Sequence, residues 1–205
     1  MNCIKFNNRE IFPSKVVCIG RNYVEHIKEL NNEVPSQMVI FNKPNSSITN
    51  ELFYFSPTHR YEGEISFLIE GSSIVGVGFG FDLTNKDAQE YAKSRGLPWE
   101  RAKAFDKSAV FSDFVSIEQS DIEELKMELY INDRLQQLAT IDLMIYKPNI
   151  ILEEIQKFMT LEDGDIVMSG TPKGVGSYNV GDKFEAKIYL DKREILNSKF
   201  IAKGL

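Results

Sequence analysis

The sequence contains little cysteine, little histidine and no long hydrophobic run. Its two thiols, Cys3 and Cys18, are too few for a disulfide framework or a four-ligand zinc site, and they favour a reducing, cytoplasmic compartment. No apolar stretch approaches the roughly 18 residues that span a bilayer. Residues 1–15 also lack the apolar core of a secretory signal. The sequence therefore predicts neither a secreted disulfide scaffold nor a membrane protein.

An excess of basic residues is missing too. The formal net charge is -6 and the pI is about 5.1, so the basic footprint of a nucleic-acid-binding protein is absent. The 205 residues, 42% of them hydrophobic, suffice for one well-buried core. The charged fraction of 26% is typical of globular chains. We expect one domain, 1–205, without a nucleic-acid partner.

Strand patterns outnumber helix patterns along the chain and do not alternate with them regularly, which favours an α+β fold over a doubly wound sheet. Strands are expected at 16–19, 39–41, 62–69, 74–81, 127–132, 136–141, 166–168 and 183–190. Helices are expected at 23–30, 86–95 and 148–159. Turns are expected at 71–73 and 133–134, and Thr84 or Asn85 can cap the second helix.

An acidic cluster is predicted from strand geometry. Glu62 and Glu64 are two residues apart in a strand, so both side chains leave the same face. A hairpin turn near 71–72 would bring Asp82 opposite them. Three converging carboxylates suit Mg²⁺ or Mn²⁺, whereas zinc is poorly matched to all-oxygen ligands. The alternative for an isolated Glu-x-Glu pair is a solvated strand face, which is the common case.

Two further motifs have open interpretations. His26 and Glu29 share one face of a short helix, which suits a general base and its orienting carboxylate, although an ordinary surface ion pair has the same spacing. The loop 169–176 could present backbone N–H groups and the Thr171 hydroxyl to an anion. It lacks the Walker A order, and taken alone it is more typical of a plain turn. His59 is assigned no role.

Six segments together carry a resemblance to a known family. They are Cys18-Ile19-Gly20-Arg21-Asn22-Tyr23 with His26 and Glu29; Phe41-Asn42-Lys43-Pro44; Glu62-Gly63-Glu64; Phe81-Asp82-Leu83-Thr84 with Asp87 and Gln89; Gly96-Leu97-Pro98-Trp99 with Lys103; and Gly170-Thr171-Pro172-Lys173-Gly174-Val175-Gly176. In this order they resemble the fumarylacetoacetate hydrolase family, and most closely its short single-domain acylpyruvase and oxaloacetate decarboxylase or tautomerase members. The similarity runs from about residue 16 to residue 184.

The resemblance implies a mixed β-rich roll of the C-terminal-domain type, a homodimer, and one catalytic domain with a lid helix near 23–30. It implies a Mg²⁺ ion, or Mn²⁺ as the alternative, on Glu62, Glu64 and Asp82. The catalytic residues that it implies are His26, Glu29, Lys103 and Gln89. The residues that it implies for substrate binding are Arg21, Tyr23, Lys86 and Thr171.

Three departures from the family pattern bear on this expectation. Only 17 residues separate Glu64 from Asp82, fewer than is usual in close relatives, so the metal hairpin is short. Lys86 stands where many relatives have arginine, and lysine cannot form a bidentate fork with a carboxylate. Tyr61 precedes Glu62 where relatives often carry histidine.

The expected substrate is a small 2-keto or β-dicarbonyl acid that reacts through a pyruvate-type enolate. The leading prediction is Mg²⁺-dependent hydrolysis of the C–C bond of acylpyruvates, with His26 as base. Oxaloacetate decarboxylation and keto–enol tautomerisation are alternatives at the same site. A catalytically silent binding module and a nucleotide-binding protein are the competing classes, and both are less favoured.

Overall fold

The computed structural model describes residues 1–25 and 37–205. Within these ranges the strands are β1 (Ile4–Phe6), β2 (Arg9–Ile11), β3 (Lys15–Gly20), β4 (Val39–Pro44), β5 (Ile48–Thr49), β6 (Phe53–Tyr54), β7 (His59–Arg60), β8 (Gly63–Glu70), β9 (Ser73–Asp82), β10 (Thr84–Asn85), β11 (Ala109–Ser116), β12 (Leu125–Ile131), β13 (Arg134–Thr140), β14 (Ile166–Met168), β15 (Lys183–Leu190), β16 (Arg193–Ile201) and β17 (Lys203–Gly204). The helices are α2 (Lys86–Arg95), α3 (Glu100–Lys103) and α4 (Pro148–Gln156), with 3-10 turns η1 (Asn45–Ser47), η2 (Gln119–Glu124) and η3 (Ile141–Leu143).

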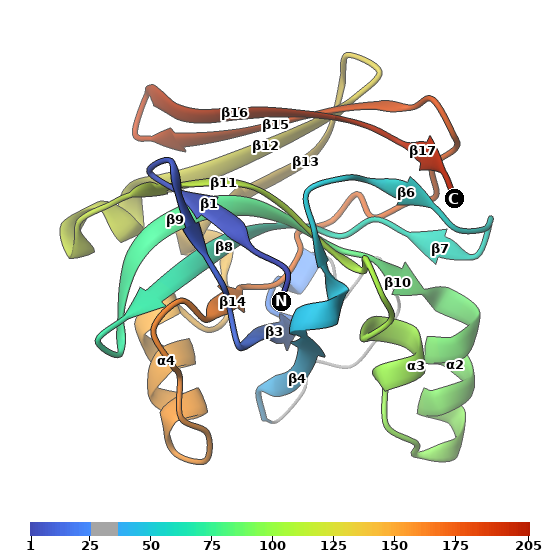
Figure 1. The fold of residues 1–205 in the computed structure, drawn as a ribbon, viewed down its shortest axis with the longest axis horizontal. Coiled ribbons are helices and arrows are strands. Elements are labelled where there is room, and N and C mark those ends of the chain that lie inside the picture. Colours follow the sequence, from blue (N-terminus) through green and yellow to red (C-terminus); the bar gives the residue numbers. More distant parts are fainter. Residues whose placement is uncertain (26–36) are drawn as a thin grey trace.

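Two sheets dominate the fold. The larger has the order β2-β1-β11-β9-β8-β14-β3-β4, with β5 also paired to β11, and it mixes parallel and antiparallel neighbours. The smaller is antiparallel, with the order β13-β12-β15-β16, and it covers one face of the larger sheet (Figure 1). Helices α2 and α3 lie together at one end of the molecule and α4 lies at the other (Figure 1). The predicted α+β, β-rich roll is confirmed.

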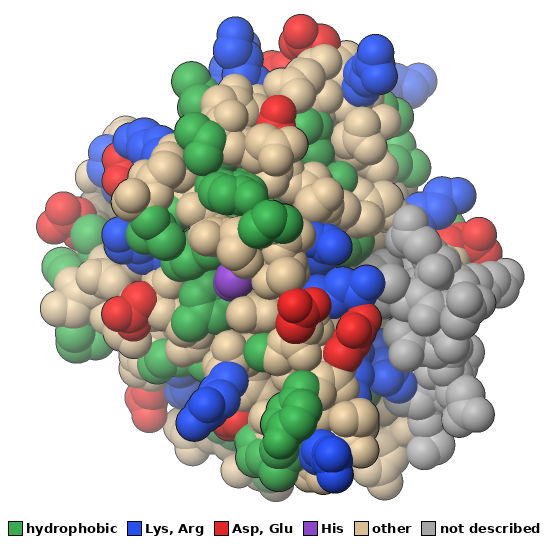
Figure 2. All heavy atoms as spheres, turned by 90° about the vertical axis from the view of Figure 1, so that its right-hand side faces the viewer, with side chains coloured by type: hydrophobic (Ala, Val, Ile, Leu, Met, Phe, Trp, Pro, Cys, Tyr) green, Lys and Arg blue, Asp and Glu red, His purple; other side chains and the backbone are tan. Residues whose placement is uncertain are grey.

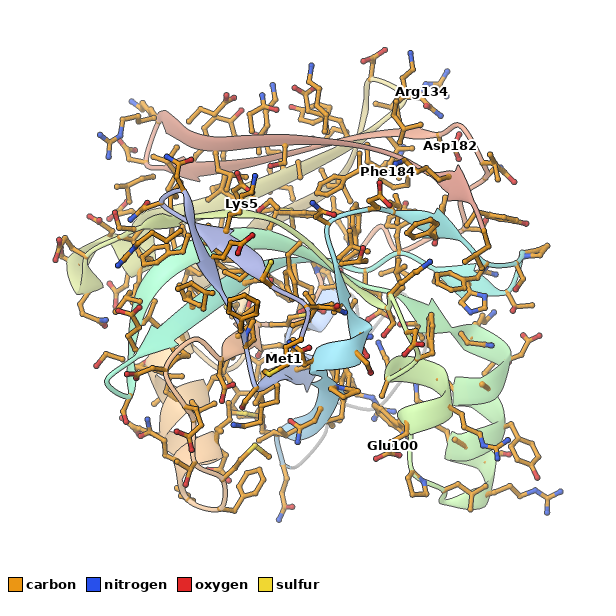
Figure 3. All side chains as sticks on the ribbon, viewed as in Figure 1. Met1, Lys5, Glu100, Arg134, Asp182 and Phe184 are labelled. Carbon is orange, nitrogen blue, oxygen red and sulfur yellow. The ribbon has the colours of Figure 1, made fainter. Side chains whose placement is uncertain are left out.

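Aromatic rings fill the space between the two sheets. Phe81 of β9 lies 5.3 Å from Phe184 of β15 and 5.4 Å from Phe200 of β16, measured between ring centroids. Figure 3 labels Phe184 between its own sheet and the strands below. Phe79 stacks edge-on to Phe81 at 4.7 Å. From Val77 to Phe81 the odd-numbered positions of β9 therefore face the smaller sheet, which leaves the even-numbered positions for the opposite face, called here the inner face.

The inner face of β9 carries glycine at positions 76, 78 and 80 and ends in Asp82. A Cβ on Gly78 would lie 2.9 Å from the Phe114 ring, and one on Gly80 would lie 2.7 Å from Phe111. Glycine in a strand interior often marks such a close approach. The rings pack directly against the backbone of β9 just before Asp82.

Several elements have the bounds that the sequence predicts. Helix 86–95, strand 166–168 and strand 183–190 agree at both ends. The Asn85 side chain caps α2 by accepting a hydrogen bond from the Ala88 amide at 3.1 Å. Gly96, with φ of 64°, ends the helix in a left-handed conformation.

Other expectations needed correction. The hairpin turn of the smaller sheet lies at Asn132 and Asp133, which both have positive φ, one residue before the predicted position. Strand β4 continues through Lys43 to Pro44, where the sequence predicted it to stop, and α4 ends at Gln156, three residues early. Strands β1, β2, β11 and β16 were not predicted.

No helix in residues 1–25 and 37–205 is long and apolar enough to cross a membrane. On the face in Figure 2, acidic and basic side chains are interspersed without an extended area of one sign. The expectation of one catalytic domain over 1–205 with a lid near 23–30 stays a prediction, because most of the lid lies outside the described residues.

Gly174 gives a test of how tightly the loop after β14 packs on β13. Its φ is +97°, and a Cβ there would lie 2.1 Å from the Gln136 carbonyl oxygen. We expect Gly174→Ala to destabilise the fold by at least about 2 kcal/mol more than a matched control, measured by thermal unfolding. The control is Gly181→Ala, where φ is +91° but nothing lies within 4 Å, so that only the backbone cost of about 1–2 kcal/mol applies. Equal melting temperatures for the two variants would contradict this packing.

Candidate metal centre

Three carboxylates converge where β8 and β9 pair at the open end of their hairpin. Glu64 lies in β8, Asp82 ends β9, and Glu62 directly precedes β8. The Asp82 amide donates to the Glu62 carbonyl at 2.9 Å. One oxygen from each of the three carboxylates lies within 4.8 Å of the other two. The structure therefore assembles the cluster that strand geometry predicts, and the short connection 65–81 does not prevent it.

The cluster is largely removed from water. Glu64 and Asp82 are each 1% exposed, and the Glu62 side chain is 15% exposed. Burial raises the pKa of Glu64 well above its ordinary value, and the negative charges of Asp82 and Glu62 raise this pKa further. Such a group is costly in its ionised form unless a cation lies beside it.

Two buried lysines flank Asp82, one at each carboxylate oxygen. Lys43 Nζ lies 2.8 Å from Oδ1, and Lys103 Nζ lies 2.6 Å from Oδ2. Lys103 Nζ also lies 2.8 Å from an oxygen of Glu62. Burial would raise the pKa of Asp82, but the two lysines outweigh it and lower that pKa. Burial likewise opposes the charge of Lys103, but Asp82 and Glu62 raise its pKa, so Lys103 stays protonated.

Lys43 is fully buried and connects the segments around Asp82. Its Nζ donates to the Leu83 carbonyl at 3.3 Å, to the Ser108 carbonyl and hydroxyl at 3.1 Å each, and to the Lys103 carbonyl. One ammonium group therefore joins the end of β9, the end of α3 and the start of β11. It orders the backbone that presents Asp82 and Lys103.

Thr84 belongs to the cluster instead of capping α2. Its hydroxyl donates to Glu62 Oε1 at 2.9 Å and accepts from Lys103 Nζ at 2.6 Å. Thr84 is 2% exposed. The Thr84 hydroxyl thus bridges the ammonium group of Lys103 and the carboxylate of Glu62, and it fixes the orientation of that carboxylate.

The glycine loop 169–176 contacts the cluster at Glu64. The Gly170 amide donates to Glu64 Oε2 at 2.7 Å, which is a charge-assisted hydrogen bond. The Thr171 hydroxyl donates to the Gly63 carbonyl at 2.9 Å and accepts from Gln137 Nε2 at 2.8 Å. The predicted anion-binding amide is therefore present, and the anion that it contacts is a carboxylate of the protein itself.

The donor set fits a hard divalent cation. All three side chains offer carboxylate oxygens, which Mg²⁺ and Mn²⁺ prefer. Asp82 Oδ1 pairs with Lys43 but accepts no hydrogen bond from the described residues, so lone pairs remain available. A cation among these oxygens would also relieve the repulsion that raises the pKa of Glu64.

Gln89 and Lys86, both predicted for the site, lie on α2 in different settings. Gln89 accepts a hydrogen bond from Lys93 Nζ at 3.1 Å. Burial lowers the pKa of Lys93, Arg21 lowers it further, and the Glu62 carboxylate opposes them, so this turn of α2 lies within electrostatic reach of the cluster. Lys86 is about half exposed and pairs with the exposed Glu90 at 3.4 Å. The structure does not bring Lys86 to the carboxylates.

Arg21 and Tyr23 follow β3. Arg21 has a φ of 59° and is half-buried. Tyr23 is 2% exposed, and its hydroxyl has no hydrogen-bond partner among the described residues. Burial raises the pKa of Tyr23, and the negative charges of Glu64 and Asp142 raise it further. The predicted base His26 and its partner Glu29 lie outside the described residues.

Sequence reasoning missed three residues of the site and its support. Lys43 appears in the Asn-Lys-Pro motif but was given no role, because the strand was predicted to end before it; a fully buried lysine is normally paired, as Lys43 is here. Thr84 was considered only as a helix cap. Gln137 was not singled out, because its partners are 74 and 34 residues away along the chain.

A curled β-rich fold buries three carboxylates and two lysines at one point, and this arrangement is able to hold a divalent cation. The family described as fumarylacetoacetate (FAA) hydrolase C-terminal matches residues 15–200. The chain belongs to the fumarylacetoacetate hydrolase family. The enzyme class predicted from the sequence, a hydrolase or a related decarboxylase or isomerase, is thereby confirmed.

Similar proteins have related names. The chain is 33% identical over 202 residues to the mitochondrial oxaloacetate tautomerase FAHD1 of Bos taurus, covering 90% of each chain. It is 36% identical over 189 residues to the oxaloacetate tautomerase YcgM of Escherichia coli strain K12, covering 83% of this chain and 86% of that one. The crystal structure of fumarylpyruvate hydrolase from Pseudomonas aeruginosa in complex with Mn²⁺ and pyruvate superposes with a TM-score of 0.88 at 25% identity, covering 100% of this chain and 96% of that one.

The raised pKa of Glu64 predicts opposite effects of Glu64→Gln with and without metal. In the presence of a chelator, Glu64→Gln should melt at a higher temperature than the wild type near neutral pH. The pKa of Glu64 is raised in the folded state, so the folded wild type loses stability as pH rises through that pKa. The glutamine side chain of the variant does not ionise, so the variant avoids this loss. With excess Mn²⁺, only the wild type should gain stability. Thermal scans between pH 5 and 8 measure both effects, and an equal Mn²⁺-induced shift in the variant would exclude Glu64 as a ligand.

Proposed function

We propose that the protein is a divalent-metal-dependent tautomerase that interconverts the keto and enol forms of oxaloacetate. The observation that carries the proposal is the buried carboxylate cluster of Glu62, Glu64 and Asp82, with the ammonium groups of Lys103 and Lys43 beside it. The names of the relatives at 33% and 36% identity agree with this activity. Tautomerisation was predicted as an alternative to acylpyruvate hydrolysis, and it becomes the leading function here.

The charge pattern suits a substrate with two carboxylates. A divalent ion, when bound by Glu62, Glu64 and Asp82, would supply positive charge that favours the enolate form of a 2-keto acid. Lys103, held in its ammonium form, donates its three N–H groups to Glu62, Asp82 and Thr84, so it would act on developing negative charge through its positive charge. Arg21 and Lys93 add positive charge on one side of the cluster. Tautomerisation needs only proton transfer at C3, and the predicted base for hydrolysis, His26, lies outside the described residues.

Hydrolysis of an acylpyruvate is the second candidate. The solved fumarylpyruvate hydrolase that holds Mn²⁺ and pyruvate has the same fold at 25% identity and favours this reaction. Hydrolysis and decarboxylation proceed through the same type of enolate, so the carboxylate cluster and Lys103 would serve all three reactions. Hydrolysis further requires an attacking water and a base, for which His26 and Glu29 remain the prediction.

The proposal is tested by following the ultraviolet absorbance of enol-oxaloacetate as it converts to the keto form. We expect Mg²⁺ or Mn²⁺ to support conversion well above the uncatalysed rate and a chelator to abolish it. Lys103→Met should lower kcat by about 10²–10³, the usual effect of removing one preorganised group that stabilises developing negative charge. Arg101→Met, an exposed change on the same helix, is the matched control. Faster cleavage of fumarylpyruvate or acetylpyruvate than conversion of oxaloacetate would make hydrolysis the principal activity.

The homodimer implied by the resemblance remains a prediction. The chain mass is 23.4 kDa, and multi-angle light scattering at working concentration should return twice that value. A monomer mass would contradict it. The predicted cytoplasmic location is likewise untested, and the relative from Bos taurus is named as mitochondrial.

A further inference from the structure

Gln137 lies on β13, in the smaller sheet, yet its side chain reaches the backbone of the carboxylate motif in the larger one. It is 1% exposed. Its Oε1 accepts from the Gly63 amide at 2.9 Å, and its Nε2 donates to the Pro172 carbonyl at 3.0 Å and to the Thr171 hydroxyl at 2.8 Å. One primary amide therefore uses both of its hydrogens and its oxygen on two segments of the site.

These partners fix the orientation of the amide. The Gly63 N–H can only donate and the Pro172 carbonyl can only accept, so a flipped amide would place like groups against each other. Nε2 must therefore also donate to the Thr171 hydroxyl oxygen. The single hydroxyl hydrogen of Thr171 then points to the Gly63 carbonyl at 2.9 Å, compared with 3.5 Å to the Pro172 carbonyl.

The two peptide groups held in this way are the ones that join Glu62 to Glu64. The Gly63 amide belongs to the peptide after Glu62, and the Gly63 carbonyl belongs to the peptide before Glu64. Strand β14 pairs with β8 only from Ser66 to Leu68, so it does not reach Gly63. Side chains of Gln137 and Thr171 take the place of the missing strand partner.

The close fit also explains the glycine between the two glutamates. A Cβ on Gly63 would lie 2.8 Å from Gln137 Oε1 and 3.0 Å from a Leu129 methyl group. The middle residue of Glu62-Gly63-Glu64 faces the smaller sheet while both carboxylates face away from it. The motif therefore needs glycine because Gln137 occupies the space behind it.

We propose that Gln137 is a positioning residue for the metal centre: it fixes the Glu62–Glu64 backbone and directs the Thr171 hydroxyl to the Gly63 carbonyl. The inference rests on the carboxylate cluster that the proposed function uses. It departs from the expectation that the Thr171 hydroxyl holds the substrate carboxylate, because that hydroxyl has already committed its hydrogen within the protein.

A double-mutant cycle on the full chain tests the proposal. Gln137→Leu and Thr171→Val should each weaken Mn²⁺ binding, measured by electron paramagnetic resonance, by about 10-fold to 100-fold, as expected for loss of the groups that orient metal ligands. The double variant should be no weaker than the more severe single variant, because both act through Gly63. Gln136→Leu is the matched control, since that side chain is exposed on the neighbouring position and Mn²⁺ affinity should not change.

Kinetics with oxaloacetate separate positioning from substrate binding. Thr171→Val should lower kcat with little change in KM if its hydroxyl acts on the Glu62–Glu64 backbone. A raised KM with unchanged Mn²⁺ affinity would show that the hydroxyl binds substrate and would overturn the proposal, as would additive losses in the double variant. The Mn²⁺ measurement needs no substrate, so it stays decisive even if the enzyme does not turn over oxaloacetate.

Gln137→Glu keeps the shape of the side chain and provides a second test if Gln137→Leu fails to fold. Burial beside the Pro172 carbonyl would raise the pKa of the introduced carboxyl group. Below that pKa the protonated carboxyl can accept from the Gly63 amide and donate to the loop, and above it the donor is lost. The Mn²⁺ affinity of the variant, divided by that of the wild type at the same pH, should therefore rise as pH falls from 8 to 5.5. A ratio that does not change with pH would overturn the proposal.

Discussion

Repulsion among three buried carboxylates governs how the rest of the site is built. Two buried lysines offset two of the three negative charges, but their contacts are unequally distributed over the three carboxylates. Asp82 contacts both ammonium groups and has a lowered pKa, whereas Glu64 receives one amide hydrogen bond and has a raised pKa. The uncompensated charge is therefore concentrated at Glu64, where a divalent cation would gain most from binding.

The apolar packing on the inner face of the larger sheet strengthens the interactions among these charges. Rings of Phe111 and Phe114 pack against the glycine-bearing side of β9, and Glu64 and Asp82 are each 1% exposed. Coulombic interactions are stronger in such a medium than in water, for attraction and for repulsion. Burial makes the cluster costly without a cation, and it also strengthens the ion pairs of Lys103 with Asp82 and Glu62.

The sequence predicted the features that depend on local order and missed those that depend on long-range contact. Helix α2 has its cap at Asn85 and its glycine stop at Gly96 within one short segment, so both ends were predictable. The carboxylate cluster followed from strand periodicity and one tight hairpin. Lys43 and Gln137 were beyond such reasoning, because their partners lie between 34 and 74 residues away in the chain. Strand β11 lacks a simple period-two pattern, because a bulge puts Phe111 and Phe114, three residues apart, on the same face of β9.

The carboxylates are supported from two directions, and Lys103 links the two because it contacts both Asp82 and Glu62. Asp82 is fixed by Lys43 and Lys103, which tie β4 and α3 to the end of β9. The Glu62–Glu64 backbone is fixed by Gln137 and Thr171, which tie the smaller sheet and the glycine loop to β8. The pairing of β8 with β9 sets the backbone separation between Asp82 and the glutamates, and the packing of the two sheets and α3 around that pair sets how the carboxylates are oriented. Because oxygen ligands must approach Mg²⁺ at about 2.1 Å in near-octahedral geometry, small shifts in that packing change metal affinity before they change the fold.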